Sequence, residues 1–111
     1  MIEQIVIDFL DGALDVPVDG EVPPAPPDTF VVVDKTGSRR ENFILSATVA
    51  VQSYAPTKYA AAALNEQAKG AMDRLIELDE IISSRLNSDY PFPDTSTKQY
   101  RYQAVYDLQH Y

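Results

Sequence analysis

The chain has 111 residues, 17 of them acidic and nine basic, with a net charge of −8. This length fits a single domain that buries its own core. The absence of cysteine excludes a disulfide framework, thiolate chemistry and a cysteine-ligated metal site. No apolar run approaches the roughly 20 residues of a membrane helix, and no basic region precedes the first apolar residues. We therefore expect a soluble intracellular product.

The first 28 residues are acidic and begin with a helical pattern. Apolar residues recur at helical spacing through residues 1–14, which predicts a short amphipathic helix ending near Gly12. Seven acids and no Lys or Arg give residues 1–28 a charge of −7, whereas the ten acids and nine bases that follow give −1. Such a segment repels a phosphate backbone, so we do not expect free nucleic acid to be the primary ligand. Solubility is the simplest interpretation of this charge.

The next stretch is proline-rich. Residues 15–22 predict a short edge strand, because Pro17 cannot donate to a ladder. Residues 23–27 hold four of the eight prolines, and such a run favours a stiff extended spacer. A ligand for an aromatic peptide-binding groove is the alternative.

Residues 30–54 predict a β-hairpin. Phe30–Asp34 is a strand by its β-branched content, and Lys35–Arg40 is predicted to be a glycine-bearing loop with a basic tip. Residues 42–54 alternate, which predicts a strand with one buried face. That face carries Phe43, Leu45, Ala47, Val49 and Val51, and Asn42, Ser46, Thr48 and Gln52 lie on the other.

Pro56 introduces the longest predicted helix, from Thr57 to about Leu78. Its apolar stripe consists of Ala61, Leu64, Ala68, Ala71, Met72, Leu75 and Leu78. The opposite face is predicted to be exposed to solvent, and it carries Lys58, Asn65, Glu66, Lys69, Asp73, Arg74 and Glu77. Laying both helices on one face of the sheet buries all these apolar faces. The sequence therefore predicts an α+β domain with a mostly antiparallel sheet of about four strands.

The last third predicts one more strand. Residues 79–86 extend the helix or form a separate turn, and residues 87–94 form a loop by their prolines and turn residues. Residues 100–109 alternate and close the sheet, with Tyr100, Tyr102 and Tyr106 on one face. Four of the seven tyrosines lie in the last twelve residues, where they serve either a partner surface or the core beneath the helix.

Catalytic chemistry is sparse in this sequence. The single histidine, His110, is penultimate, where we expect a solvated side chain and no catalytic relay. The four glycines form no phosphate-binding loop. Carboxylate pairs such as Asp73 with Glu77, or Asp79 with Glu80, are expected to be solvated. We therefore expect no enzyme, no cofactor and no metal site.

The order of these parts carries a resemblance. A short N-terminal helix, an extended Val16–Pro27 stretch, a Phe-Val-Val-Val strand, a long alternating strand, an Ala-rich helix, a Tyr-Pro-Phe-Pro-Asp loop and a Tyr-Arg-Tyr-Gln strand follow one another. Together they resemble the tail terminator (tail completion) proteins of long-tailed bacteriophages and prophages. The likeness covers residues 1–111 as one domain and rests on element order and on phrases such as Val22-Pro23 and Tyr100-Arg101-Tyr102.

The resemblance implies a structural protein of the virion tail, made in the host bacterial cytoplasm. Members of that family are α+β subunits that form a ring, usually a hexamer, on the last ring of the tail tube. The ring stops tail growth and presents a surface to the head-completion protein. Partners would then be further copies of the chain, the tail tube protein and the head-completion protein, with no membrane, no cofactor and no sequence-specific nucleic acid.

Interfaces would carry that function, and the candidate interface residues are Lys35, Arg39, Arg40, Tyr100, Tyr102 and Tyr106. One hypothesis is that the basic hairpin tip contacts the acidic N-terminal quarter of the adjacent subunit. A second is that some of the acidity lines the channel and keeps passing DNA from sticking. The alternatives are a head-tail connector or neck (head-closure) protein, a small peptide-binding adaptor, and an enzyme with a deep apolar pocket.

Overall fold

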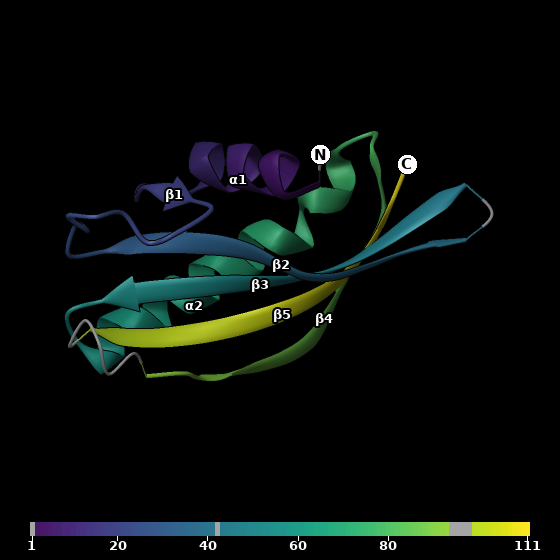
Figure 1. Cartoon of the computed structure of the whole chain (residues 1–111). Helices are drawn as coiled ribbons and strands as arrows, with labels where there is room; N and C mark the ends of the chain where they lie inside the picture. The colour runs from purple at the N-terminus through teal and green to yellow at the C-terminus, as the bar shows by residue number, and fades with distance from the viewer. Residues whose placement is uncertain (1, 42, 94–98) are drawn as a thin grey trace.

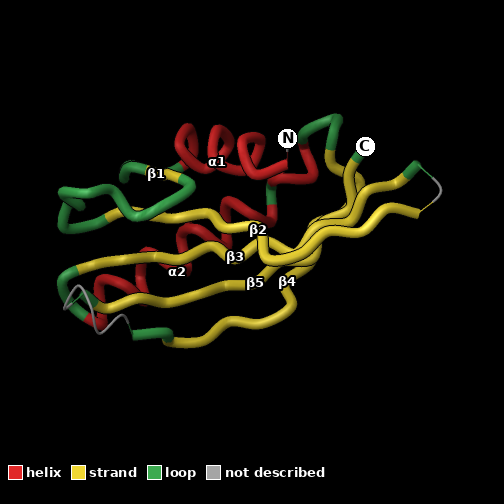
Figure 2. The backbone as a smooth tube through the Cα atoms, viewed as in Figure 1, coloured by secondary structure: helices red, strands yellow, loops and turns green. Residues whose placement is uncertain are grey.

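Two helices cover one face of a five-stranded sheet in the computed structural model (Figures 1 and 2), which describes residues 2–41, 43–93 and 99–111. The elements are α1 (Ile2–Ala13), β1 (Val18–Asp19), β2 (Phe30–Glu41), β3 (Ile44–Ala55), α2 (Lys58–Asp73), the 3-10 helix η1 (Leu75–Glu77), β4 (Ile81–Pro91) and β5 (Tyr100–His110). The strand order is β1-β2-β3-β5-β4, antiparallel throughout except for β1 beside β2. The predicted α+β class is therefore confirmed.

The helices divide the sheet between them. α1 packs along β1 and β2, whereas α2 lies across β3 and β5 and reaches β4. The opposite face of the sheet carries no helix among the described residues (Figure 1). Neither helix is long and apolar enough to cross a membrane, within the part of the chain that is described.

The core forms where the sequence periodicities predict it. Six residues of the predicted α2 and η1 stripe are buried, and Leu78 is partly buried. They meet alternating side chains of β3 and β5, and α1 adds apolar side chains beside them on the same face of the sheet. The sheet and α1 contribute Val31, Val33, Ala47, Val49, Val51, Ala104, Tyr106 and Leu108 together with Ile2, Val6 and Leu10.

Thr57 fixes the start of α2. Its hydroxyl oxygen accepts a hydrogen bond from the Ala60 N–H at 3.1 Å, and its backbone is extended, as at a helix N-cap. We expect Thr57→Ala to lower the free energy of unfolding by about 1 kcal/mol, and Thr57→Ser to retain most of the stability because it keeps the oxygen. Urea denaturation followed by circular dichroism measures both changes. A Thr57→Ala protein as stable as the wild type would show that this cap contributes nothing.

Four predicted boundaries are wrong. The long helix was expected to reach about Leu78, but α2 ends at Asp73 and the 3-10 helix η1 follows it. Residues 35–40 are not a loop, because they continue β2 in register with β3 as far as the Glu41 and Ile44 pair. Residues 81–91 are neither helix nor loop but the edge strand β4, which is paired along its length with β5. The expected edge strand at residues 15–22 shrinks to Val18–Asp19. With β4 added, the sheet has five strands and not about four. Residues 42 and 94, the ends of two predicted segments, lie outside the described residues.

Candidate interaction surfaces

The three predicted basic residues all lie in β2, between its middle and the hairpin turn. A register shift between Lys35 and Gly37 places one extra residue in this strand, as in a β-bulge. Lys35 pairs with Val49 and Arg40 with Leu45, so both share the face that the helices cover. Arg39 pairs with Ser46 and therefore points to the uncovered face. The structure splits the predicted basic tip between the two faces of the sheet.

The hairpin tip is exposed on both faces and projects beyond the body of the molecule (Figure 1). Phe43 has a φ of 68°, in the left-handed region, and its side chain is 85% exposed. Arg39 and Glu41 form an ion pair at 3.8 Å, but both side chains are mostly exposed. Such a pair contributes little to stability. The tip thus presents one large apolar side chain next to basic ones.

The uncovered face of the sheet is a hydrogen-bonded polar surface. The Gln52 amide donates to Gln103, whose own amide donates to the Tyr90 hydroxyl at 2.6 Å. Thr48 and Asn87 donate to separate oxygens of Asp107, at 3.2 and 2.9 Å. These bonds cross from β3 through β5 to β4, so they hold the middle of the face in one arrangement.

Aromatic rings occupy the other end of this face. Phe30 and Tyr54 stack with their centroids 4.4 Å apart. The Arg101 guanidinium lies 5.4 Å from the Tyr54 ring centroid and 4.1 Å from that of Phe92. Arg101 also donates to the Phe92 carbonyl and to the Tyr54 hydroxyl. The arginine thereby joins the end of β4 to β3 and β5.

The candidate tyrosines of β5 separate into surface and core. Tyr100 is 47% exposed, and Tyr102 is half-buried. Tyr106 is only 1% exposed beneath α2, and its hydroxyl lies 3.4 Å from the Lys69 carbonyl, to which it donates. Burial raises the pKa of Tyr106 to about 12. Tyr106 is therefore a core residue and not a surface for a partner.

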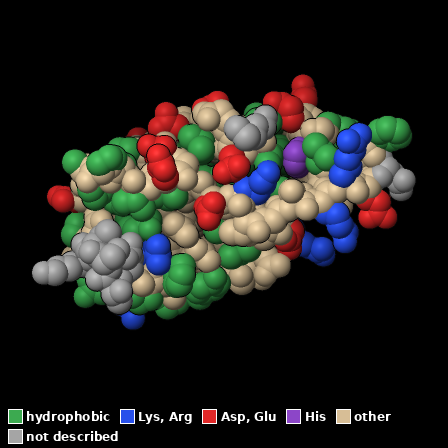
Figure 3. Space-filling model, in the orientation of Figure 1, with side chains coloured by type: hydrophobic (Ala, Val, Ile, Leu, Met, Phe, Trp, Pro, Cys, Tyr) green, Lys and Arg blue, Asp and Glu red, His purple; other side chains and the backbone are tan. Residues whose placement is uncertain are grey.

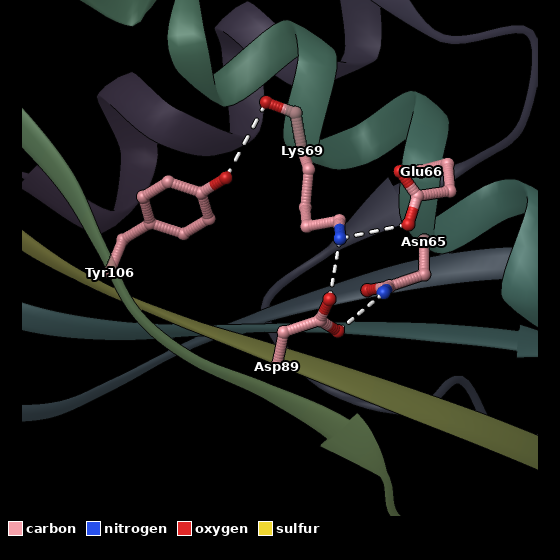
Figure 4. A network of polar contacts seen from close by, with 5 residues as sticks. All are labelled: Asn65, Glu66, Lys69, Asp89 and Tyr106. Carbon is pink, nitrogen blue, oxygen red and sulfur yellow. Dashed lines mark hydrogen bonds and ion pairs between the residues drawn. The ribbon is translucent and has the colours of Figure 1, made fainter.

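A polar network ties α2 to β4 (Figure 4). The Lys69 ammonium donates to Asp89 and also contacts Glu66 at 2.8 Å, while the Asn65 amide donates to Asp89 at 2.7 Å. Burial by itself raises the pKa of Asp89, but the hydrogen bonds from Lys69 and Asn65 outweigh it and leave this pKa below its ordinary value. The hydrogen bonds that Lys69 donates to Asp89 and Glu66 raise the pKa of its own ammonium group. The prediction that this side of the helix is exposed to solvent is thus wrong for Asn65, which is buried, and for Lys69, which is half-buried.

The acidic N-terminal quarter lies along one edge of the sheet. Its exposed acids are Asp8, Asp11, Asp15, Asp19, Glu21 and Asp28. In Figure 3, acidic side chains gather at the top, over α1, and basic ones at the right, over the hairpin. Opposite charges are therefore separated within the molecule, as the sequence counts indicated.

His110 does not have the solvated side chain that its penultimate position predicts. It is 7% exposed and lies opposite Leu45 in the register, beside the start of β4. Asp73, Glu77, Asp79 and Glu80 are exposed, as predicted. No cluster of three potential metal ligands occurs among the described residues. The candidate interaction sites are therefore the surfaces described above: the basic hairpin and the polar and aromatic parts of the uncovered face.

Comparison with known proteins identifies the fold only. No protein-family model matches the chain, and no curated protein matches it. Among solved structures, the chain is similar to a chain from the virion of a native gene transfer agent (GTA) particle. The two have 13% sequence identity and a TM-score of 0.50 over 95% of this chain and 83% of that chain. At this identity, the likeness shows a shared fold.

Proposed function

We propose that this chain is a structural protein of a phage-like virion, and more specifically the ring that caps the tail tube. The observation that carries this proposal is the fold shared along 95% of the chain with a component of a gene transfer agent virion. The tail-terminator resemblance of the sequence supports the finer assignment. In this role the ring ends tail polymerisation and offers its outer surface to the head-completion protein.

The distribution of side chains supports a function that depends on binding surfaces and not on catalysis. The polar groups of the uncovered face bond mainly to one another, and the single histidine is buried against the sheet. The carboxylate with a lowered pKa, Asp89, is engaged by Lys69 and Asn65 in a link between α2 and β4. These groups serve the fold, and we propose that the protein has no enzymatic activity.

Ring assembly fits the segregation of charge. Acids lie along the α1 and β1 edge, whereas basic side chains lie at the hairpin end. Two different patches on one subunit are suited to a heterologous contact, and such contacts close into rings.

Electron microscopy of particles made without this chain tests the proposal. We expect overlong tails that lack heads, because nothing stops the growth of the tube. Tails of normal length that fail to join heads would instead assign the chain to the head-tail connector or neck. Particles of normal length and normal infectivity would contradict both roles. Restoring the wild-type gene in trans is the control.

A further inference from the structure

A hollow of about 460 Å³ lies on the uncovered face of the sheet, near the base of the hairpin. All four long strands contribute to it. Cross-strand pairing aligns Arg39, Ser46 and Gln109 in one row and Thr48, Asp107 and Arg85 in the next, so these six side chains lie on the same face. Arg85 was not among the interface residues predicted from the sequence, because β4 was not predicted to be a strand.

The two arginines of this hollow have spare hydrogen-bonding capacity. Asp107 already accepts from Thr48 and Asn87, one on each oxygen. Among the described residues, Arg85 has no ion pair or side-chain hydrogen bond, and Arg39 has only the exposed contact with Glu41 at 3.8 Å. Guanidinium groups bind carboxylates through paired, charge-assisted hydrogen bonds. The hollow therefore offers two guanidinium groups to an incoming carboxylate.

We propose that this hollow binds the acidic N-terminal segment of a second copy of the chain, residues 11–28. The inference rests on the proposed ring and specifies which surfaces meet in it. Asp11, Asp15, Asp19, Glu21 and Asp28 are exposed and have no basic neighbour in sequence. Residues 1–28 carry seven acids and no Lys or Arg, so this segment complements the local positive charge of the two guanidinium groups.

The sheet topology keeps the two patches apart within one subunit. The acidic segment leads into β1 at one edge of the sheet, whereas Arg85 lies on β4 at the other edge. Arg39 lies seven residues beyond the β2 partner of Asp19, roughly 23 Å along an extended strand. The hollow and the acids can therefore meet only between two copies. A head-to-tail arrangement of such contacts forms a ring when its rotation closes.

Charge reversal with a matched control tests the contact. Arg39→Glu with Arg85→Glu should raise the dissociation constant for self-association about tenfold or more at low salt. Lys58→Glu with Arg74→Glu makes the same charge change on exposed side chains outside the hollow and the hairpin, and should have a much smaller effect. Sedimentation equilibrium at about 0.1 M and about 1 M NaCl measures both, because high salt screens an exposed ionic contact.

Compensation gives the decisive result. Asp15→Lys with Asp19→Lys and Glu21→Lys should weaken association alone and restore it when combined with Arg39→Glu and Arg85→Glu. If a chain that carries Arg39→Glu and Arg85→Glu does not fold, as judged by circular dichroism, the neutral substitutions Arg39→Gln and Arg85→Gln replace the charge reversals.

Four results would overturn the inference. Three of them are equal effects of the hollow and control variants, no rescue in the combined variant, and a wild-type chain that stays monomeric at every concentration. A fourth is salt-dependent binding of short duplex DNA that disappears with Arg39→Glu and Arg85→Glu, since it assigns the hollow to nucleic acid. Rescue together with normal tails in particles lacking the chain would leave this contact standing and would refute only the terminator role.

Discussion

Tyr106→Ala should lower the free energy of unfolding by about 3–5 kcal/mol, the range for removing a large buried aromatic side chain. Tyr106 is 1% exposed and fills the space between β5 and α2, so its loss leaves a cavity that neighbouring side chains cannot close. A domain of this size has a total stability of about 5–15 kcal/mol. The substitution therefore removes a large part of that stability. Guanidinium denaturation followed by circular dichroism measures it.

Two variants make this prediction specific. Tyr106→Phe should cost less than about 1 kcal/mol, because the hydroxyl makes only a 3.4 Å hydrogen bond. Tyr100→Ala, on the same strand but 47% exposed, should change stability by less than about 0.5 kcal/mol. Similar losses for Tyr100→Ala and Tyr106→Ala would contradict the division of these tyrosines into surface and core.

Asp89→Ala should lower the free energy of unfolding by about 1–2 kcal/mol at neutral pH, after allowance for the partial exposure of the network. The change leaves the buried Asn65 amide without its acceptor and Lys69 with only Glu66. It also removes one of the polar links between β4 and α2, while the hydrogen bond from Ser84 to the Met72 carbonyl remains. Urea denaturation measures the loss, and Asp79→Ala, at an exposed site before β4, is the control.

The same carboxylate makes stability depend on pH. Its pKa is lower in the folded chain than the ordinary value of 3.8, so the folded state favours the charged form. The stabilisation is therefore fully present above about pH 4, and it is lost as pH falls through the folded pKa. We expect this part of the acid loss to be absent from Asp89→Ala. Parallel stability profiles of the two proteins below pH 4 would rule out the contribution of Asp89.

The sequence predicted the elements whose two sides differ most in polarity. The alternation of residues 42–54 and the three-and-four spacing of the α2 stripe each follow from one buried face. Ala47, Val49 and Val51 are buried as predicted, and so is most of the stripe, but Phe43 is 85% exposed and lies before the start of β3. The edge strand β4 gives no such signal, because only Ile81 is buried and two register shifts interrupt its alternation. The segment Lys35–Glu41 is exposed to solvent on both sides for most of its length. Its glycine and polar residues therefore gave a sequence pattern that is typical of a loop.

The surfaces were harder to predict than the fold. Asn65 and Lys69 fall on the polar side of the α2 pattern, and their partner Asp89 belongs to the strand that was missed. Arg85 was overlooked for the same reason. Periodicity reports burial along one element, whereas a network or a hollow depends on which elements become neighbours. Charge counting was more informative, since it separated the acidic quarter from the rest of the chain.

The extra residue between Lys35 and Gly37 determines how the two adjacent arginines are used. Strict alternation from Lys35 would have turned Arg39 toward the helices and Arg40 toward the open side of the sheet. A deletion or insertion of one residue before the arginines would thus exchange their orientations without altering the composition of the hairpin. Related chains are consequently best aligned by the phase of this strand relative to β3, because residues that match by sequence position alone can serve opposite surfaces.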